Sequence, residues 1–364
     1  MNALFQPLPF SRGPVMKNRF MLAPLTNLQS HENGVLSDEE FKWLTMRASG
    51  GFGLVMTCAA HVQAIGQGFP GQLGVFSDIH LDGLSRVAAG IRRHGSLAFI
   101  QLHPAGLRSP ADLIGARPVC PSADKETGAR EMSIGEVEQL ANDFVAAAAR
   151  AECAGFHGIE VHGAHGYILG QFLSPTVNRR TDRFGGSLVN RSRLLFDIVD
   201  RIRTQSGPDF LISVRLSPER FGMDLSEVIV IAQRVLESGE IDLLDMSLWD
   251  VFKEPEDKQF KGDSLLSPFT ALERGTVRLA AAGKITGTHE AEQVIAAGVD
   301  IVTIGRSAIL HHDFPELCRA DPDFRPHELP VSREYLRHQG LSSRFIDYMS
   351  SWEGFVTGPD GQGD

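Results

Sequence analysis

The chain has 364 residues, of which 42% are hydrophobic and 22% are charged, and its formal net charge is −10. These values are typical of a globular protein with a large buried core and exclude an intrinsically disordered chain. Acidic chains bind nucleic acid and anionic membrane surfaces poorly, so we expect neither as a partner.

The cysteines and the N-terminus indicate the cellular compartment. The four cysteines lie far apart and none belongs to a C-x-x-C motif, which excludes a clustered zinc or iron–sulfur ligand run and does not resemble a secreted disulfide framework. The N-terminal residues form no continuous apolar segment, and no run reaches the roughly 18 apolar residues of a membrane span. We therefore expect a cytoplasmic protein. The cysteines are Cys58, Cys120, Cys153 and Cys318.

Short apolar runs rich in β-forming residues recur along the chain, and each is followed by a longer segment with helical spacing. The runs cover residues 19–26, 53–60, 96–103, 158–164, 211–217, 243–249, 277–284 and 299–306. Eight such units predict an α/β fold, a (β/α)8 TIM barrel of parallel strands. A doubly wound sheet would usually show a G-x-G-x-x-G turn after its first strand, and the chain has none there.

Two of the intervening segments carry clear helix signals. Residues 133–154 open with the capping-box pattern SIGE and carry apolar residues on one stripe. Residues 288–298 end at a glycine, which is typical of the position just after a helix. Both segments are predicted to be helices.

Several segments rich in proline and glycine follow predicted strands and are therefore predicted to be long βα loops. They cover residues 63–74, 103–131 and 249–268. We place the barrel in residues 1–330 and a C-terminal extension in residues 331–364. The extension contains Trp352 and Phe355, and packing on its own barrel and self-association of the protein explain it equally well.

The stretch VHGAHGY, residues 161–167, ends the fourth predicted strand, where barrel active sites form. A metal site is one interpretation of His162 and His165, but zinc normally has three or four protein ligands and no third stands at a recognisable spacing. A structural histidine pair is another. In the third, two neutral imidazoles donate hydrogen bonds to one substrate oxygen, and Tyr167, protonated near neutral pH, acts as an acid.

Polar side chains also mark other strand ends. Arg215 lies in the fifth apolar run, where it either forms an ion pair with a neighbouring strand or stabilises negative charge at the barrel mouth. Gln101 ends the third run and can both donate and accept hydrogen bonds.

The last two predicted strands end in AAGK, residues 281–284, and TIGR, residues 303–306. Barrels frequently bind phosphate with the loops after these two strands, because glycine allows close approach and arginine binds phosphate through two hydrogen bonds. Together with the polar groups above, they suggest a phosphorylated ring cofactor lying across the barrel mouth.

Over residues 1–320 the sequence resembles the Old Yellow Enzyme family of FMN-dependent oxidoreductases. The longest motif is GIEVHGAHGYILGQFLSPTVNRRTDRFGGSLVNRSR at residues 158–193. The shorter motifs are NRFMLAPLT at 18–26, QLHPAG at 101–106, VRLS at 214–217 and GVDIVTIGR at 298–306.

This resemblance implies specific roles. His162 and His165 would bind the carbonyl or nitro oxygen of an activated alkene, and Tyr167 would protonate the α-carbon while hydride passes from flavin N5 to the β-carbon. Arg215 would lie beside the flavin N1/C2 carbonyl. The flavin ring would be bordered by Pro24, Thr26, Ala59 and Gln101. The FMN phosphate would be held by Gly283, Lys284, Gly305 and Arg306.

The sequence departs from relatives at several pocket positions. Pro104 and Leu107 stand where relatives often have histidine and arginine, and Leu28 stands where some have an aromatic residue. The sequence also lacks the second nucleotide-binding region and cysteine cluster of longer iron–sulfur relatives, so electrons are expected directly from NADH or NADPH. We expect an ene-reductase that acts on small enone-type substrates.

Two other classes of protein use similar features. A flavin-free aldolase or isomerase with a phosphorylated substrate would use the same glycine and arginine positions, but it normally needs a lysine or carboxylate at a strand end. Lys284 is the only lysine at a predicted strand end, and Glu160 lies within the fourth run. A non-catalytic ligand-binding barrel would have no use for a proton donor beside two histidines.

Overall fold

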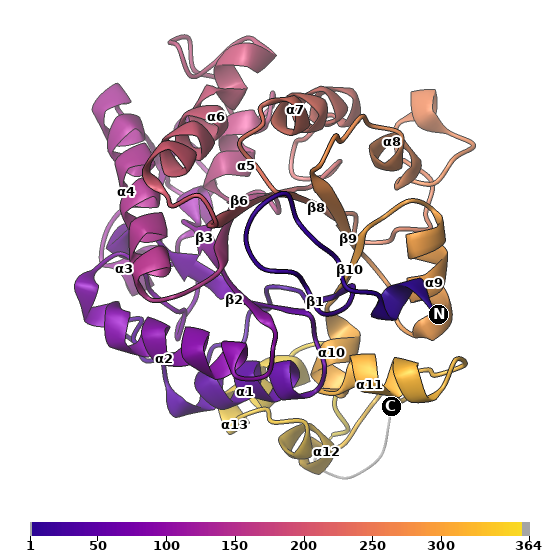
Figure 1. Ribbon diagram of the computed structural model, residues 1–364. Helices are drawn as coiled ribbons and strands as arrows, with labels where there is room; N and C mark the ends of the chain where they lie inside the picture. Colours follow the sequence, from indigo (N-terminus) through magenta and orange to yellow (C-terminus); the bar gives the residue numbers. More distant parts are fainter. Residues whose placement is uncertain (1, 359–364) are drawn as a thin grey trace.

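The computed structural model describes residues 2–358 and contains eight parallel strands closed into a barrel, in the order β1-β10-β9-β8-β7-β6-β3-β2 (Figure 1). The strands are β1 Phe20–Leu22, β2 Leu54–His61, β3 Leu97–His103, β6 Gly158–Gly163, β7 Leu211–Leu216, β8 Leu243–Ser247, β9 Arg278–Ala282 and β10 Ile301–Ile304. Each lies within one residue of a predicted run. The predicted TIM barrel is confirmed.

Helices surround this barrel, as parallel strands joined by crossovers require (Figure 1). The longer ones are α1 Asp38–Ser49, α2 Leu81–Arg92, α4 Ile134–Cys153, α6 Leu188–Gln205, α7 Leu225–Glu237 and α9 Thr288–Ala296. The shorter ones are α3 Ala111–Ile114, α5 Ile168–Leu173, α8 Ser267–Thr270, α10 Arg306–Leu310, α11 Phe314–Ala320, α12 Arg333–His338 and α13 Ser343–Ser350.

Both helices predicted from terminal signals are present. The Ser133 hydroxyl accepts a hydrogen bond from the Glu136 backbone N–H, and the Glu136 carboxylate accepts one from the Ser133 N–H, which forms the predicted capping box of α4. After α9 the chain turns at Gly298, whose φ of 102° favours glycine.

The N-terminal segment closes one end of the barrel. Leu8 and Met16 pair as an antiparallel bridge, and both pack in a buried cluster with residues that begin the strands, among them Leu54, Leu97 and Leu211. In Figure 1 the indigo N-terminal segment crosses the end of the barrel. Since this apolar plug seals the end where strands begin, the opposite end is left for a functional site.

The predicted long loops follow β2, β3 and β8. The loop after β3 contains α3 and a small two-stranded sheet of β4 (Val119–Cys120) and β5 (Arg130–Glu131). The sequence did not predict this small sheet, because strands of two residues carry no periodic pattern.

The C-terminal segment packs on the helices of its own barrel. Phe345 of α13 is fully buried, and its ring meets that of Trp43 of α1 edge to face at a centroid distance of 4.9 Å. Leu336, Ile346 and Met349 belong to the same apolar core as the barrel strands. Residues 359–364 of the predicted extension lie outside the described residues, and its boundary at residue 330 stays a prediction.

None of the helices within residues 2–358 combines the length and the apolar composition needed to cross a membrane.

Replacing Phe345 by Ala should lower the free energy of unfolding by about 3–5 kcal/mol, because it opens a cavity between α13 and α1. Urea denaturation measures this loss. Arg344→Ala, at an exposed position of the same helix, should change the unfolding free energy by less than about 0.5 kcal/mol. Equal stability of the two variants would show that α13 contributes nothing to the core.

Candidate active site

The VHGAHGY motif stands at the open end of the barrel, where β6 leads into α5. His162 is the penultimate residue of β6 and pairs in register with Arg215 of β7. His165 follows in the left-handed region, with φ of 59°, and turns the chain so that Tyr167 immediately precedes α5. The structure therefore brings together the three residues that the sequence predicted to act as one site.

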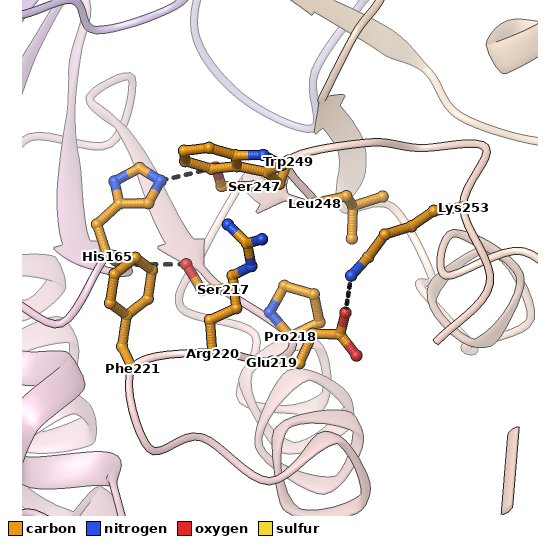
Figure 2. Close-up of a pocket in the computed structure, with 10 residues that line it drawn as sticks. All are labelled: His165, Ser217, Pro218, Glu219, Arg220, Phe221, Ser247, Leu248, Trp249 and Lys253. Carbon is orange, nitrogen blue, oxygen red and sulfur yellow. Dashed lines mark hydrogen bonds and ion pairs between the residues drawn. The ribbon is translucent and has the colours of Figure 1, made fainter. Parts of the chain in front are cut away.

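Hydrogen bonds fix the two histidines in a row. His162 Nε2 lies 3.3 Å from His165 Nδ1, and His165 Nε2 lies 2.7 Å from the hydroxyl of Ser247 on β8. The backbone N–H of His165 donates to the hydroxyl of Ser217 at 3.1 Å. Figure 2 shows both serine contacts of His165. Ser247 thus orients the imidazole of His165, and Ser217, which directly follows β7, holds its backbone.

Burial keeps both imidazoles neutral. It lowers the pKa of His165 to about 3, helped by the charges of Arg215 and Arg108. It also holds the pKa of His162 well below its ordinary value, helped by His165. A neutral imidazole offers one N–H donor, and within residues 2–358 the buried Nδ1 of His162 has no hydrogen-bond partner. The other three ring nitrogens of the pair have partners in each other and in Ser247, so an oxygen acceptor bound by both imidazoles would have to replace one of these contacts.

Tyr167 lies in a polar aromatic cluster. Its ring centroid is 4.2 Å from that of His103 on β3 and 5.3 Å from that of His162. The guanidinium carbon of Arg108 lies 4.8 Å from the ring centroid. Burial raises the pKa of Tyr167, and Arg108 opposes this rise. The phenol is therefore protonated at neutral pH, as an acid must be before it donates.

The sequence reasoning missed His103 and Arg108. They stand directly beside Pro104 and Leu107, the two positions at which the sequence was expected to depart from the family motif. Two basic residues next to these positions were a readable signal, but only the structure shows that both side chains reach Tyr167.

A buried charged network lies inside the barrel below these residues. Arg215 Nε is 3.0 Å from a carboxylate oxygen of Asp245 on β8, so the expected ion pair with a neighbouring strand is present. The carboxylate of Glu160 on β6 accepts hydrogen bonds from the Gln101 amide at 2.8 Å and the Ser213 hydroxyl at 2.9 Å. Burial and Asp245 raise the pKa of Glu160 to about 7, and Arg215 opposes the rise.

The remaining predicted positions lie around the mouth. Residues in the strands are almost all buried, but several at the open end are half-buried, so a ligand above the barrel could contact them. These half-buried positions are Pro24, Thr26, Ala59, Gly283 and Gly305. A Cβ atom added at Gly305 would lie in ordinary van der Waals contact with Leu25 and Ala23, at 3.8 Å and 3.9 Å.

The two predicted cations follow adjacent strands, β9 and β10, but have different surroundings. Arg306 is exposed, and its guanidinium lies 5.8 Å from the Trp352 ring. Lys284 is 64% exposed, and its ammonium lies 2.9 Å from the Asp250 carboxylate. Packing alone explains why residue 283 is a glycine, because a Cβ atom added there would come within 2.7 Å of the backbone nitrogen of Asp250.

A small hollow adjoins His165 between the loops after β7 and β8 (Figure 2). Arg220 stacks over the exposed Trp249 at its rim, at 4.6 Å from the ring centroid. Residues 2–358 contain no group of three or more His, Cys, Asp or Glu side chains placed to hold a metal ion.

The donor set and the open strand ends fit FMN. The neutral imidazoles and the small half-buried residues at the barrel mouth suit a planar ring. The cation that follows each of the last two strands supplies positive charge for a phosphate.

Comparison with known proteins agrees with this geometry. A model of the NADH:flavin oxidoreductase / NADH oxidase family matches residues 3–321. The NADPH dehydrogenase of Geobacillus sp. (strain WCH70) is 34% identical over 319 residues, which cover 86% of this chain and 92% of that protein.

Two solved structures are also similar. The old yellow enzyme homologue from Zymomonas mobilis has a TM-score of 0.78 and 26% identity, with coverage of 100% of this chain and 99% of that one. A 2-naphthoyl-CoA reductase complex has a TM-score of 0.80 and 28% identity, with coverage of 88% of this chain. This chain spans only 52% of that longer one.

Fold and site together define a flavin-dependent oxidoreductase built on a TIM barrel. The chain belongs to the NADH:flavin oxidoreductase family, that of Old Yellow Enzyme, whose members bind FMN and take electrons from NADH or NADPH.

The buried Glu160 should make stability depend on pH. Its folded pKa of about 7 exceeds the ordinary 4.5, so the folded state keeps a proton that the unfolded state releases. Glu160 by itself should therefore lower the free energy of unfolding as pH rises from about 4.5 to 7, by up to about 1.4 kcal/mol per pH unit, against the rise that the buried neutral histidines contribute over the same range. Glu160→Gln should remove only the Glu160 contribution, so its unfolding free energy should rise more steeply with pH than that of the wild type, as urea denaturation at several pH values measures.

Glu136→Gln is the matched control. The pKa of Glu136 is lowered to about 2 by Arg130 and the Ser133 N–H, so its contribution changes only below pH 4.5. Between pH 5 and 7 this variant should keep the wild-type slope. Parallel profiles of Glu160→Gln and wild type over the same range would contradict a proton on Glu160.

Proposed function

We propose that the protein reduces activated C=C bonds of α,β-unsaturated carbonyl or nitro compounds at the expense of NAD(P)H. The observation that carries the proposal is the placement of two neutral imidazoles and one protonated phenol at the end of β6, beside Arg215. Bound FMN would supply the hydride chemistry.

The side chains divide the remaining work. His162 and His165 donate hydrogen bonds to the carbonyl or nitro oxygen, which draws electron density from the double bond and fixes the substrate in one orientation. Tyr167 donates its proton to the α-carbon, and this proton is replaced from solvent.

The same proposal assigns the cofactor contacts. Arg215 would lie at the electron-rich N1/C2 edge of the flavin, with Asp245 limiting the net charge there. The half-buried mouth positions Pro24, Thr26 and Ala59 would border the ring together with Gln101. The phosphate would be held by Gly283, Lys284, Gly305 and Arg306.

A flavin-free aldolase or isomerase is less well supported. A Schiff-base lysine needs a desolvated environment that lowers its pKa. Lys284 instead has an exposed side chain and a carboxylate partner in Asp250.

Replacing Tyr167 by Phe should leave flavin reduction by NAD(P)H nearly unchanged. Flavin reoxidation by cyclohexenone should slow by about 10²–10⁴, because the proton donor is lost. Anaerobic stopped-flow absorbance measures both steps. Tyr335→Phe is the control, because that hydroxyl donates to the Leu310 carbonyl oxygen and stands outside the site. Equal loss in both steps of Tyr167→Phe would remove the proton-donor role.

Replacing His162 or His165 by Ala should weaken binding of a phenol inhibitor by roughly tenfold each, because each variant loses one hydrogen bond to the phenol oxygen. Titration of the charge-transfer absorption between phenol and flavin measures the affinity. His312→Ala, whose imidazole contacts Gln339 away from the site, should bind phenol as the wild type does. Unchanged affinity in both site variants would make the histidines structural.

A further inference from the structure

Two basic side chains flank Tyr167 and have no part in the proposed chemistry. His103 ends β3, and its ring meets that of Tyr167 edge to face, at an angle of 83°. Arg108 lies in the short 3-10 helix Gly106–Arg108 that follows, with its guanidinium over the same ring. His103 thus belongs to β3 and Arg108 to the loop that follows it, whereas Tyr167 stands at the start of α5.

The tautomer of His103 follows from its neighbours. The Gln72 amide oxygen accepts the Gly68 N–H at 2.6 Å, and its amide nitrogen donates to the Ala59 carbonyl oxygen at 2.7 Å. These two bonds fix the amide orientation, so the second amide N–H faces His103 Nδ1 at 3.1 Å. Nδ1 is therefore the acceptor, and Nε2 carries the hydrogen.

This Nε2–H donor is buried and has no conventional acceptor within the part of the chain that the structure describes. Burial lowers the pKa of His103 to about 3, so the ring is neutral. An unpaired buried donor is costly, and the Tyr167 ring is closer to the His103 ring than that of His162 is, with centroid distances of 4.2 Å and 5.6 Å. An aromatic face accepts a weak N–H hydrogen bond.

Arg108 is held in place from the other side. It donates a hydrogen bond to the His165 carbonyl oxygen at 2.7 Å, and no carboxylate among residues 2–358 forms an ion pair with it. The other titratable groups around Tyr167 are uncharged, since His162 and His165 are neutral and Tyr348 of α13 is a phenol. Arg108 is therefore the one formal charge at the ring among these neighbours.

We propose that His103 and Arg108 are positioning residues that hold the Tyr167 ring between them and stabilise its phenolate during proton transfer. When the O–H bond of Tyr167 breaks and the α-carbon gains the proton, the ring becomes more electron-rich. The attraction of an N–H donor and of a cation then grows, which lowers the free-energy cost of the transfer. The inference rests on the proposed role of Tyr167 as proton donor.

The test measures the acidity of Tyr167 directly. The chain has three tyrosines, so the FMN-loaded protein labelled with 3-fluorotyrosine gives three 19F NMR signals, which single Tyr→Phe variants assign. Arg108→Leu should raise the titration midpoint of Tyr167 by about one pH unit, in keeping with the strength of a cation over an aromatic ring. Arg108→Lys should restore most of the shift, while the midpoint of Tyr335 should stay unchanged.

Two further variants test His103. His103→Phe keeps a flat ring but removes the N–H, and should also raise the Tyr167 midpoint; His103→Gln, which keeps an N–H at a similar reach, should raise it less. Arg108 is exposed, so its replacement is not expected to disturb folding. The Arg108 variants therefore test the proposal even if a His103 variant fails to fold. A Tyr167 midpoint that Arg108→Leu leaves unchanged would overturn the proposal.

The midpoints do not depend on turnover, which separates this inference from the proposed function. If the midpoints shift but Tyr167→Phe reoxidises normally, the ring is tuned and the proton-donor role fails. If Tyr167→Phe reoxidises slowly and the midpoints do not shift, the proton-donor role stands and the two positioning residues fail. If Tyr167 is the proton donor and Arg108 tunes its acidity, Arg108→Leu should shift the pH profile of flavin reoxidation in the same direction as the titration midpoint of Tyr167.

Discussion

The site depends on the register between β6 and β7, which places His162 beside Arg215 at the open end of the barrel. Parallel strands alternate their side chains, so this pairing also fixes what lies below. Glu160, two residues earlier, faces the interior beside Ser213 and Gln101. One residue of slip would turn the imidazole outward and the carboxylate out of its hydrogen bonds.

The two ends of the barrel are stabilised by different interactions. The end where strands begin is sealed by the N-terminal segment and an apolar cluster, which stabilises the fold without polar groups. The interior toward the other end contains Arg215, Asp245 and Glu160, all buried. Buried charges are costly unless they are paired. Arg215 forms its ion pair with Asp245, so the second carboxyl group, that of Glu160, retains a proton. The barrel thus offers a polar but nearly neutral floor to a bound flavin.

The sequence predicted the parts of this structure that local patterns encode. The eight apolar runs, the capping box at Ser133 and the glycine at residue 298 act over a few residues, so the barrel and its clear helices could be predicted. The grouping of His162, His165 and Tyr167 was also local. Contacts between strands and loops were not, because no short pattern shows that Lys284 meets Asp250 or that Gln101 binds Glu160. His103 and Arg108 stood beside two altered motif positions, but their role depends on ring geometry at Tyr167.

The most direct test of ene-reduction is the visible absorption spectrum of the purified protein, followed through anaerobic addition of NADPH and then cyclohexenone. We predict flavin bands that bleach with NADPH and return with the enone. Bleaching without return would contradict ene-reduction and leave the electrons for a different oxidant. A colourless protein that takes up no added FMN would contradict the flavin site as a whole.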